Sequence, residues 1–323
     1  MNEYLTNGLQ LAAGVGVLFF GAEWLVRGAA RLAASLGVSP IVVGLTVVSL
    51  GTSAPELVVS LTAALRGNSD LAMGNVMGSN LANIGLILGL TALIRPMKVS
   101  ARVVTREVPI MLGVTALLYP LSWWDRELGQ ADGFVLVVVL GLYILFVNRV
   151  AGEEPSEVLG EYEEFARAEG QLGRKVTYRD IGLVVVGSLG LVGGGTLIVN
   201  SAEFLAEAMG VPDILVGLTV VAVGTSLPEL ATSMVAAVRE EADIAVGNIV
   251  GSNIFNVAAI LGTTSLVTPV QVAPEILVQE LPAVLLLSLI VVPVTWNGFV
   301  VRRWEGAVLL TLYVVLGILL FTT

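Results

Sequence analysis

The sequence predicts an all-α membrane protein of ten transmembrane helices, arranged as two inverted repeats of five helices each. Three observations predict this fold. The chain of 323 residues is 56% hydrophobic and only 13% charged, whereas a soluble domain carries about 25% charged residues. Apolar runs of about 18 residues or more recur along its length. One stretch also occurs twice, at a constant offset of 173 residues.

The repeated stretch comprises residues 44–89 and 217–262, which align without a gap. More than half of the 46 aligned positions are identical. Both copies carry the polar motifs GTSxPE and GNxxGSNxxN within otherwise apolar sequence. Self-similarity at a fixed offset is the signature of a duplicated architecture, so we expect the two halves of the chain to share one fold.

Ten apolar segments are long enough to span a bilayer. The predicted spans are residues 8–33, 39–65, 71–94, 103–122, 131–148, 181–208, 212–237, 244–267, 277–295 and 304–321. Five spans precede the polar loop 149–180 and five follow it, and an odd number per half reverses the orientation of the second half. We therefore expect a first repeat over residues 1–148, a cytoplasmic acidic loop over 149–180, and a second, inverted repeat over 181–323.

The basic residues predict the orientation of the chain. With the N-terminus outside, the cytoplasmic connections hold 14 of the 16 Lys and Arg residues, and only Arg66 and Arg126 lie outside. By the positive-inside rule, both termini are expected on the outer side of the cytoplasmic (inner) membrane. The loop 149–180 lacks the ligand pattern of an EF-hand, and we expect it to be a solvated connector.

The GTSxPE motif predicts a broken helix with a buried acid in each repeat. Pro55 and Pro228 lack a backbone N–H and clash with the preceding turn, which frees carbonyl groups there. Inside a membrane such carbonyls must face protein, water or an ion. Glu56 and Glu229 each place a carboxylate near the middle of a span, where a charge is costly and marks a functional site.

The GNxxGSNxxN motif predicts a second wall for the same site. Its serine and final asparagine are four residues apart, which puts Ser79 with Asn83, and Ser252 with Asn256, on one helix face. With the threonines and serines of GTSxPE, these groups form a site of oxygen donors, which suits hard cations such as calcium and sodium. We expect some of the other asparagines to bridge or cap helices: Asn75, Asn80, Asn248 and Asn253.

A midplane cation site between inverted repeats with broken helices is typical of a secondary transporter. A passive channel would need rings of like groups along an open pore. A membrane enzyme could use the two carboxylates as acid and base, but no nucleophile has a base beside it. The chain has no cysteine and no histidine. We expect no cofactor and no nucleic-acid partner; the lipid bilayer is the expected surrounding, and a monomer suffices for function.

At these motifs the sequence resembles the cation/calcium exchanger superfamily, and most closely its sodium/calcium exchanger branch. The resemblance covers nearly the whole chain. It implies a secondary-active antiporter of a prokaryotic cytoplasmic membrane that exchanges sodium for calcium by alternating access. It also implies that two long helices, here 8–33 and 181–208, slide across the rest of the molecule.

The resemblance implies ion ligands at the positions that match the motifs of the family. From the first repeat they are Thr52, Ser53, Glu56, Ser79 and Asn83, and from the second Ala222 (through its carbonyl), Thr225, Ser226, Glu229, Ser252 and Asn256. Ser49, the repeat mate of Ala222, would offer its carbonyl likewise. The proton-coupled branch has GNxxE in place of GTSxPE. A calcium/proton antiporter of the same fold is the alternative, and a channel or membrane enzyme is less favoured.

Overall fold

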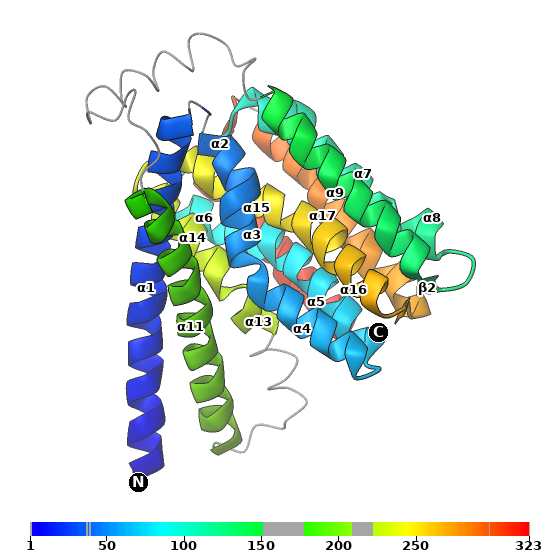
Figure 1. Ribbon diagram of the computed structural model, residues 1–323, viewed down its shortest axis with the longest axis horizontal. Helices are drawn as coiled ribbons and strands as arrows, with labels where there is room; N and C mark the ends of the chain where they lie inside the picture. Colours follow the sequence, from blue (N-terminus) through cyan, green and yellow to red (C-terminus); the bar gives the residue numbers. More distant parts are fainter. Residues whose placement is uncertain are drawn as a thin grey trace.

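The computed structural model describes residues 2–36, 38, 40–150, 178–208, 222–296 and 298–322. This part of the chain is mostly helical (Figure 1). Two long helices, α1 (Asn2–Leu36) and α11 (Tyr178–Ala208), lie side by side at one edge of the molecule. The remaining elements pack beside this pair and form the core.

The core elements follow a similar order in both halves, with the single helix α17 of the second half in place of α7 and α8, and with the positions that match α2 and η1 outside the described residues. In the first half they are α2 (Pro40–Val43), the π-helix η1 (Gly44–Val48), α3 (Ser49–Thr52), α4 (Ala54–Leu65), α5 (Ser69–Ala82), η2 (Asn83–Leu88), α6 (Gly89–Ile94), β1 (Met97–Lys98), η3 (Val103–Glu107), α7 (Val108–Ala116), α8 (Leu118–Ser122), β2 (Glu127–Leu128) and α9 (Gln130–Val150). In the second half they are α13 (Ala222–Thr225), α14 (Leu227–Val238), α15 (Ala242–Phe255), η5 (Asn256–Leu261), α16 (Gly262–Val267), β3 (Val270–Gln271), η6 (Ile276–Glu280), α17 (Leu281–Trp296), β4 (Val300–Val301) and α18 (Arg303–Thr322).

The boundaries of these elements repeat at the offset of 173 residues found in the sequence. Helices α4 and α14 begin and end at matching positions, and so do α5 and α15, η2 and η5, and η3 and η6. The short strands obey the same relation, with β3 at the position of β1 and β4 at that of β2. Each strand pairs antiparallel with a strand of the other half, β1 with β4 and β2 with β3. The predicted all-α fold agrees with the mostly helical structure, but none of these strands was predicted. Each is two residues long, too short for a periodic pattern to reveal it.

Within the described residues, eight helices are long and apolar enough to cross a membrane, or nine when a bent pair counts as one span. Their ends agree closely with the predicted spans; the predicted span 103–122, for example, has the bounds of the helical segment Val103–Ser122. The predicted span 212–237 extends into residues 209–221, which lie outside the described part, and its described portion includes α14. Most of the predicted loop 149–180 also lies outside the described residues.

A sharp bend interrupts the helix that carries the first GTSxPE motif. The segments Pro40–Thr52 and Ala54–Leu65 meet at Ser53 with a bend of 46°. Ser226 precedes α14 with nearly the same backbone angles as Ser53, φ −86° and ψ 4° against φ −81° and ψ 9°. In both halves the proline follows in the first turn of the next helix, where its missing N–H costs no hydrogen bond. Each break therefore puts the glutamate of its motif in a first helical turn.

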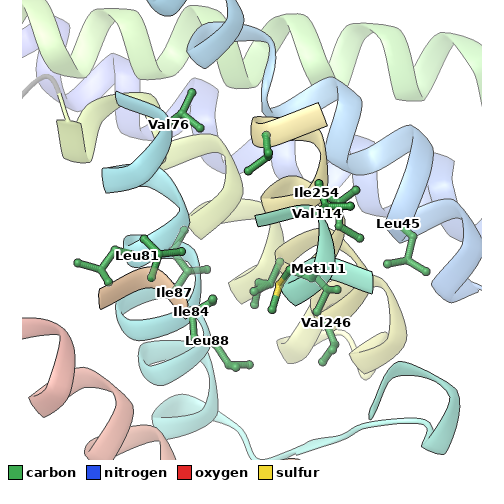
Figure 2. Close-up of a cluster of buried hydrophobic side chains, with 14 of the residues drawn as sticks. Leu45, Val76, Leu81, Ile84, Ile87, Leu88, Met111, Val114, Val246 and Ile254 are labelled. Atoms are coloured by element: carbon green, nitrogen blue, oxygen red, sulfur yellow. The ribbon is translucent and has the colours of Figure 1, made fainter. Parts of the chain in front are cut away.

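The two spans with the GNxxGSNxxN motif form the centre of the core. The span Ala242–Val267 is the most buried of the candidate spans, and Ser69–Ile94 follows it. Figure 2 shows buried apolar side chains of this core, among them Ile84, Ile87 and Leu88 of η2 and Met111 and Val114 of α7. Lipid is as apolar as these side chains, so close packing rather than a hydrophobic driving force holds such helices together.

Candidate ion-binding site

The breaks of both halves meet the central spans at one place in the core. Helix α4 packs against α5 and α14 against α15 within each half, while α3 contacts α15 and α13 contacts α5 across the halves. The GTSxPE motif of one half therefore lies against the GNxxGSNxxN motif of the other. This crossing brings the predicted site residues of both repeats together.

The two carboxylates are bound reciprocally by serines of the opposite repeat. The Ser53 hydroxyl donates to Oε1 of Glu229 at 3.0 Å, and the Ser226 hydroxyl donates to Oε1 of Glu56 at 3.4 Å. Both glutamates are 1% exposed. In each carboxylate the second oxygen, Oε2, has no hydrogen-bond partner among the described residues. Each carboxylate is thus held at one oxygen and available at the other.

Two asparagines position the turns that carry these glutamates. The Asn75 amide nitrogen donates to the Glu56 carbonyl at 3.2 Å and to the Ser60 hydroxyl at 2.9 Å. In the second repeat the Asn248 amide nitrogen donates to the Glu229 carbonyl at 3.4 Å and to the Ser233 hydroxyl at 3.1 Å. The expectation that some of the additional asparagines bridge helices agrees with these contacts.

The threonines of GTSxPE complete this network across the halves. The Thr52 hydroxyl donates to Oδ1 of Asn248 at 3.0 Å, and the Thr225 hydroxyl donates to Oδ1 of Asn75 at 3.4 Å. Each asparagine therefore joins the glutamate turn of its own repeat to the threonine of the other. Such a fully buried network fixes the geometry of the groups it connects.

The predicted residues of the second motif lie in the same buried region. Asn83 and Asn256 are the first residues of the π-helices η2 and η5, and π-turns inside helices are frequent at functional sites. Neither amide atom of Asn83 has a partner among the described residues, and Oδ1 of Asn256 and the Ser252 hydroxyl lack one too. The Ser79 hydroxyl lies 3.3 Å from that of Ser226.

The unpartnered oxygens of these residues are the main chemical feature of the site. Buried polar groups in proteins are nearly always hydrogen-bonded, and exceptions need an explanation. The atoms concerned are Oε2 of Glu56 and Glu229, Oδ1 of Asn83 and Asn256, and the Ser252 hydroxyl. A hard cation would satisfy them. No group of three or more His, Cys, Asp or Glu residues suited to a metal occurs in the described part of the chain, so neutral oxygens would provide most ligands.

The carbonyls of Ser49 and Ala222, the two expected backbone ligands, have different surroundings. The Ser49 carbonyl already accepts the Ser53 N–H at 3.0 Å, and the Thr52 hydroxyl oxygen lies 3.3 Å from it. The Ser49 hydroxyl lies 2.8 Å from the Gly44 carbonyl of its own span and 3.1 Å from the Asn248 carbonyl of α15, so it lies between the two spans. Ala222 begins α13 directly after residues outside the described part, and the role of its carbonyl stays a prediction.

Sequence reasoning missed Ser60 and Ser233. Both are buried, and each accepts a hydrogen bond from the asparagine that positions the glutamate. A signal for them was present, because each lies four residues after its glutamate, on the same helix face, and recurs in both copies of the repeat.

Comparison with known proteins places the chain among transporters. A family model described as sodium/calcium exchanger protein matches residues 7–148 and 180–322. The chain belongs to the sodium/calcium exchanger family. The match covers both repeats and leaves out only the ends of the chain and the connection between the halves.

Similar proteins agree with this assignment. This exchanger-family chain is 34% identical to the sodium/calcium exchanger MaX1 of Methanosarcina acetivorans, in an alignment of 350 positions that covers 98% of each chain. It is 37% identical to the inner membrane protein YrbG of Escherichia coli over 290 residues, 89% of this chain and 88% of YrbG. It is also 25% identical to the Ca(2+)/H(+) antiporter ChaA of Bacillus subtilis over 314 residues, 90% of this chain and 86% of ChaA.

The fold is also that of a solved family member. The sodium-calcium exchanger NCX_Mj, soaked with 2.5 mM Na+ and 10 mM Sr2+, superposes with a TM-score of 0.82 at 27% identity, covering 97% of this chain and 98% of that chain. Together these findings identify a multi-pass membrane protein of an ion-exchanger family and support a role as an antiporter.

Proposed function

We propose that this protein exchanges sodium for calcium across the cytoplasmic membrane by alternating access. The observation that carries the proposal is the set of buried oxygens without a partner around Glu56 and Glu229. A buried divalent cation needs compensating charge, and the two carboxylates supply two negative charges. Calcium takes six to eight oxygen ligands in flexible geometry, which the surrounding hydroxyl and amide groups can complete.

The proposed ligands come from both repeats. They are Thr52, Ser53, Glu56, Ser79, Asn83, Ala222 through its carbonyl, Thr225, Ser226, Glu229, Ser252 and Asn256. The reciprocal hydrogen bonds of Ser53 with Glu229 and of Ser226 with Glu56 support this set, because they bring the two motifs to one place. Asn75, Asn248, Ser60 and Ser233 would position the ligands rather than bind the ion.

Sodium is the coupling ion that suits this site best. Sodium binds neutral oxygens, and hydroxyl and amide groups outnumber the carboxylates here. Asn83 and Asn256 can coordinate a cation but cannot carry a proton at neutral pH. The chain also lacks histidine, the side chain that titrates most readily near neutral pH. The alternative is a calcium/proton antiporter of the same fold, in which the two carboxylates would carry the protons.

The proposal includes the architecture expected from the sequence: ten spans, with residues 1–148 and 181–323 as inverted repeats, a cytoplasmic connection over 149–180, and both termini outside. The constant offset of the element boundaries supports the duplication, and so does the pairing of each short strand with a strand of the other half. The division of basic residues supports the orientation. A monomer holds both halves of the site and suffices for function.

The proposed exchange is tested with purified protein in proteoliposomes. Calcium uptake is measured under an outward sodium gradient alone and under an outward proton gradient alone, each at clamped membrane potential and without potassium. We expect uptake with the sodium gradient only. Uptake that follows the proton gradient and ignores sodium would contradict the proposal and favour the proton-coupled alternative.

A further inference from the structure

An ion pair joins the long helix α1 to the end of core helix α14. The Glu23 carboxylate of α1 accepts a hydrogen bond from Nε of Arg239 at 2.5 Å. It also forms an ion pair with Nη2 of the same arginine. Arg27, one turn further along α1, also contacts Glu23 at 2.6 Å. Only 11% of the Glu23 side chain is exposed, and α1 packs along α14. A carboxylate this buried depends on its partner, since an unpaired buried charge is costly.

The other half of the molecule contains the same two residue types on the corresponding elements. The segment AEFL at 202–205 resembles AEWL at 22–25 at an offset of 180 residues, so Glu203 lies on α11 about two helical turns beyond the position that the repeat offset of 173 gives for Glu23. At the repeat offset of 173, Arg66 matches Arg239, and these two arginines follow α4 and α14 as their C-terminal caps.

The second pair of elements is not assembled in the same way. Helix α11 has no packing contact with α4 comparable to that of α1 with α14 in the described part of the chain. Arg66 is exposed, and it forms no ion pair with any side chain that the structure describes. An ion pair between a long helix and the core is therefore formed at Arg239, whereas Arg66 forms none with the described side chains, although the same two residue types occur in both halves.

Helices α1 and α11 are joined closely enough to move as one unit. A Cβ on Gly21 would lie 2.8 Å from the Leu191 backbone nitrogen, and one on Gly187 would lie 2.5 Å from that of Leu25. Backbones this close leave little room for the two helices to separate. A shift of the pair across the core that separates Glu23 from Arg239 would also move α11 relative to α4.

We propose that Glu23 and Arg239 form a latch that holds one end of the transport pathway closed, and that Glu203 and Arg66 form the opposite latch in the alternate state. The inference rests on the proposed alternating-access function. Arg239 lies at the end that the basic residues place in the cytoplasm, so the assembled latch seals the site from that side. Both pairs are positioning residues: they set the ratio of the two states and do not touch the ion.

The neighbouring residue offers a matched control. Glu240 lies in the same turn as Arg239, and its carboxylate binds Nη2 of Arg95, after α6, at 2.5 Å. Arg95 also donates to the Val238 carbonyl at 3.0 Å. Both partners belong to the core, so this ion pair stays formed in both states.

The latch is tested by cross-linking, which is simple because the chain has no cysteine. Glu23→Cys with Arg239→Cys is joined by a short bifunctional maleimide, and Arg95→Cys with Glu240→Cys serves as the control. We expect the first cross-link to abolish sodium-driven calcium uptake and the second to leave it intact. Continued uptake after the first cross-link, or failure of that link to form although each cysteine reacts singly, would overturn the latch. Absence of uptake in the unlinked wild type would instead count against the proposed exchange.

Charge removal gives an independent measurement that does not depend on cross-linking. Glu23→Gln or Arg239→Gln should lower the calcium concentration for half-maximal transport at the cytoplasmic side and raise it at the outer side, by up to about ten-fold, because apparent affinity follows the fraction of the competent state. Glu203→Gln or Arg66→Gln should shift both values in the opposite directions. Changes in the same direction on both sides would show a merely structural role and refute the proposal.

Discussion

At the residue scale, the two glutamates differ from every other candidate ligand because they supply charge. Each has one oxygen bound by the serine of the opposite repeat and one without a partner in the described part of the chain. Replacing either carboxylate by an amide preserves the size of the side chain and removes one of the two charges that would face a divalent ion. The cost of binding calcium then rises steeply, since a buried cation needs its counter-charge.

We therefore predict that Glu56→Gln and Glu229→Gln each reduce calcium transport at least about 100-fold, which corresponds to roughly 2.7 kcal/mol, while the protein still folds and inserts. Calcium uptake into proteoliposomes measures the effect, and gel filtration in detergent checks folding. Glu275→Gln, which removes an exposed charge, is the control and should retain full activity. Near-normal flux in either site variant would contradict the assignment.

The sequence predicted the types of side chain in the site but not how they are connected. GTSxPE and GNxxGSNxxN identified the hydroxyls, amides and acids, because each is polar within an apolar span. The hydrogen bond from Thr52 to Asn248 joins residues 196 positions apart, and no local pattern reveals such a contact. Which oxygens remain unpartnered depends on these distant contacts, and so does the bridging role of Ser60 and Ser233.

At the element scale, α15 packs closely against η1, the π-helix that directly precedes the broken segment of the first repeat. A Cβ on Gly251 would lie 2.8 Å from the Leu45 carbonyl and would also collide with the Ser49 hydroxyl. That hydroxyl lies between the Gly44 carbonyl and the Asn248 carbonyl of α15. Glycine at this position therefore allows the two helices to pack close to the broken segment.

We predict that Gly251→Ala destabilises the protein by about 1–3 kcal/mol, the usual cost of overpacking. The unfolding temperature in detergent measures this effect. Gly141→Ala is the control, because no described atom lies within 4 Å of a Cβ at this exposed position of α9. Equal unfolding temperatures for the two variants would show that the contact between α15 and η1 can relax without cost.

The sequence predicted most helix ends within a few residues, because apolar runs end at charged or glycine-rich connections. The π-helices were not predicted. A π-turn adds a single residue to a turn, which changes the apolar pattern too little to detect. The bend at Ser53 was expected from Pro55, since the chemistry of proline is local. The strand pairs β1–β4 and β2–β3 were missed for the opposite reason: they join the two halves of the chain.

At the scale of the whole molecule, the duplication is visible in sequence and structure alike. The offset of 173 residues aligns helices, π-helices and strands in both halves, and strands from one half pair with strands from the other. The shared site needs both halves, because each carboxylate is bound by a serine of the opposite repeat. How the halves lie across the membrane stays a prediction from the distribution of basic residues.

That topology predicts opposite locations for the central loop and the C-terminus. Single cysteines at Ser156 and Thr322 should react with a membrane-impermeant thiol reagent from opposite sides in intact and inside-out vesicles. The cysteine-free wild type provides the background. Reaction of both cysteines from the same side would contradict the ten-span, inverted arrangement.

The central claim is that one buried site takes calcium and sodium in turn, and competitive binding tests it most directly. Equilibrium binding of radioactive calcium to the purified protein is measured while sodium is increased at constant ionic strength, for the wild type and for the double variant Glu56→Gln with Glu229→Gln. We predict that sodium displaces calcium from the wild type with a Hill coefficient above one, and that the double variant binds no calcium. Calcium that stays bound at saturating sodium, or equal calcium binding by the double variant, would contradict the account.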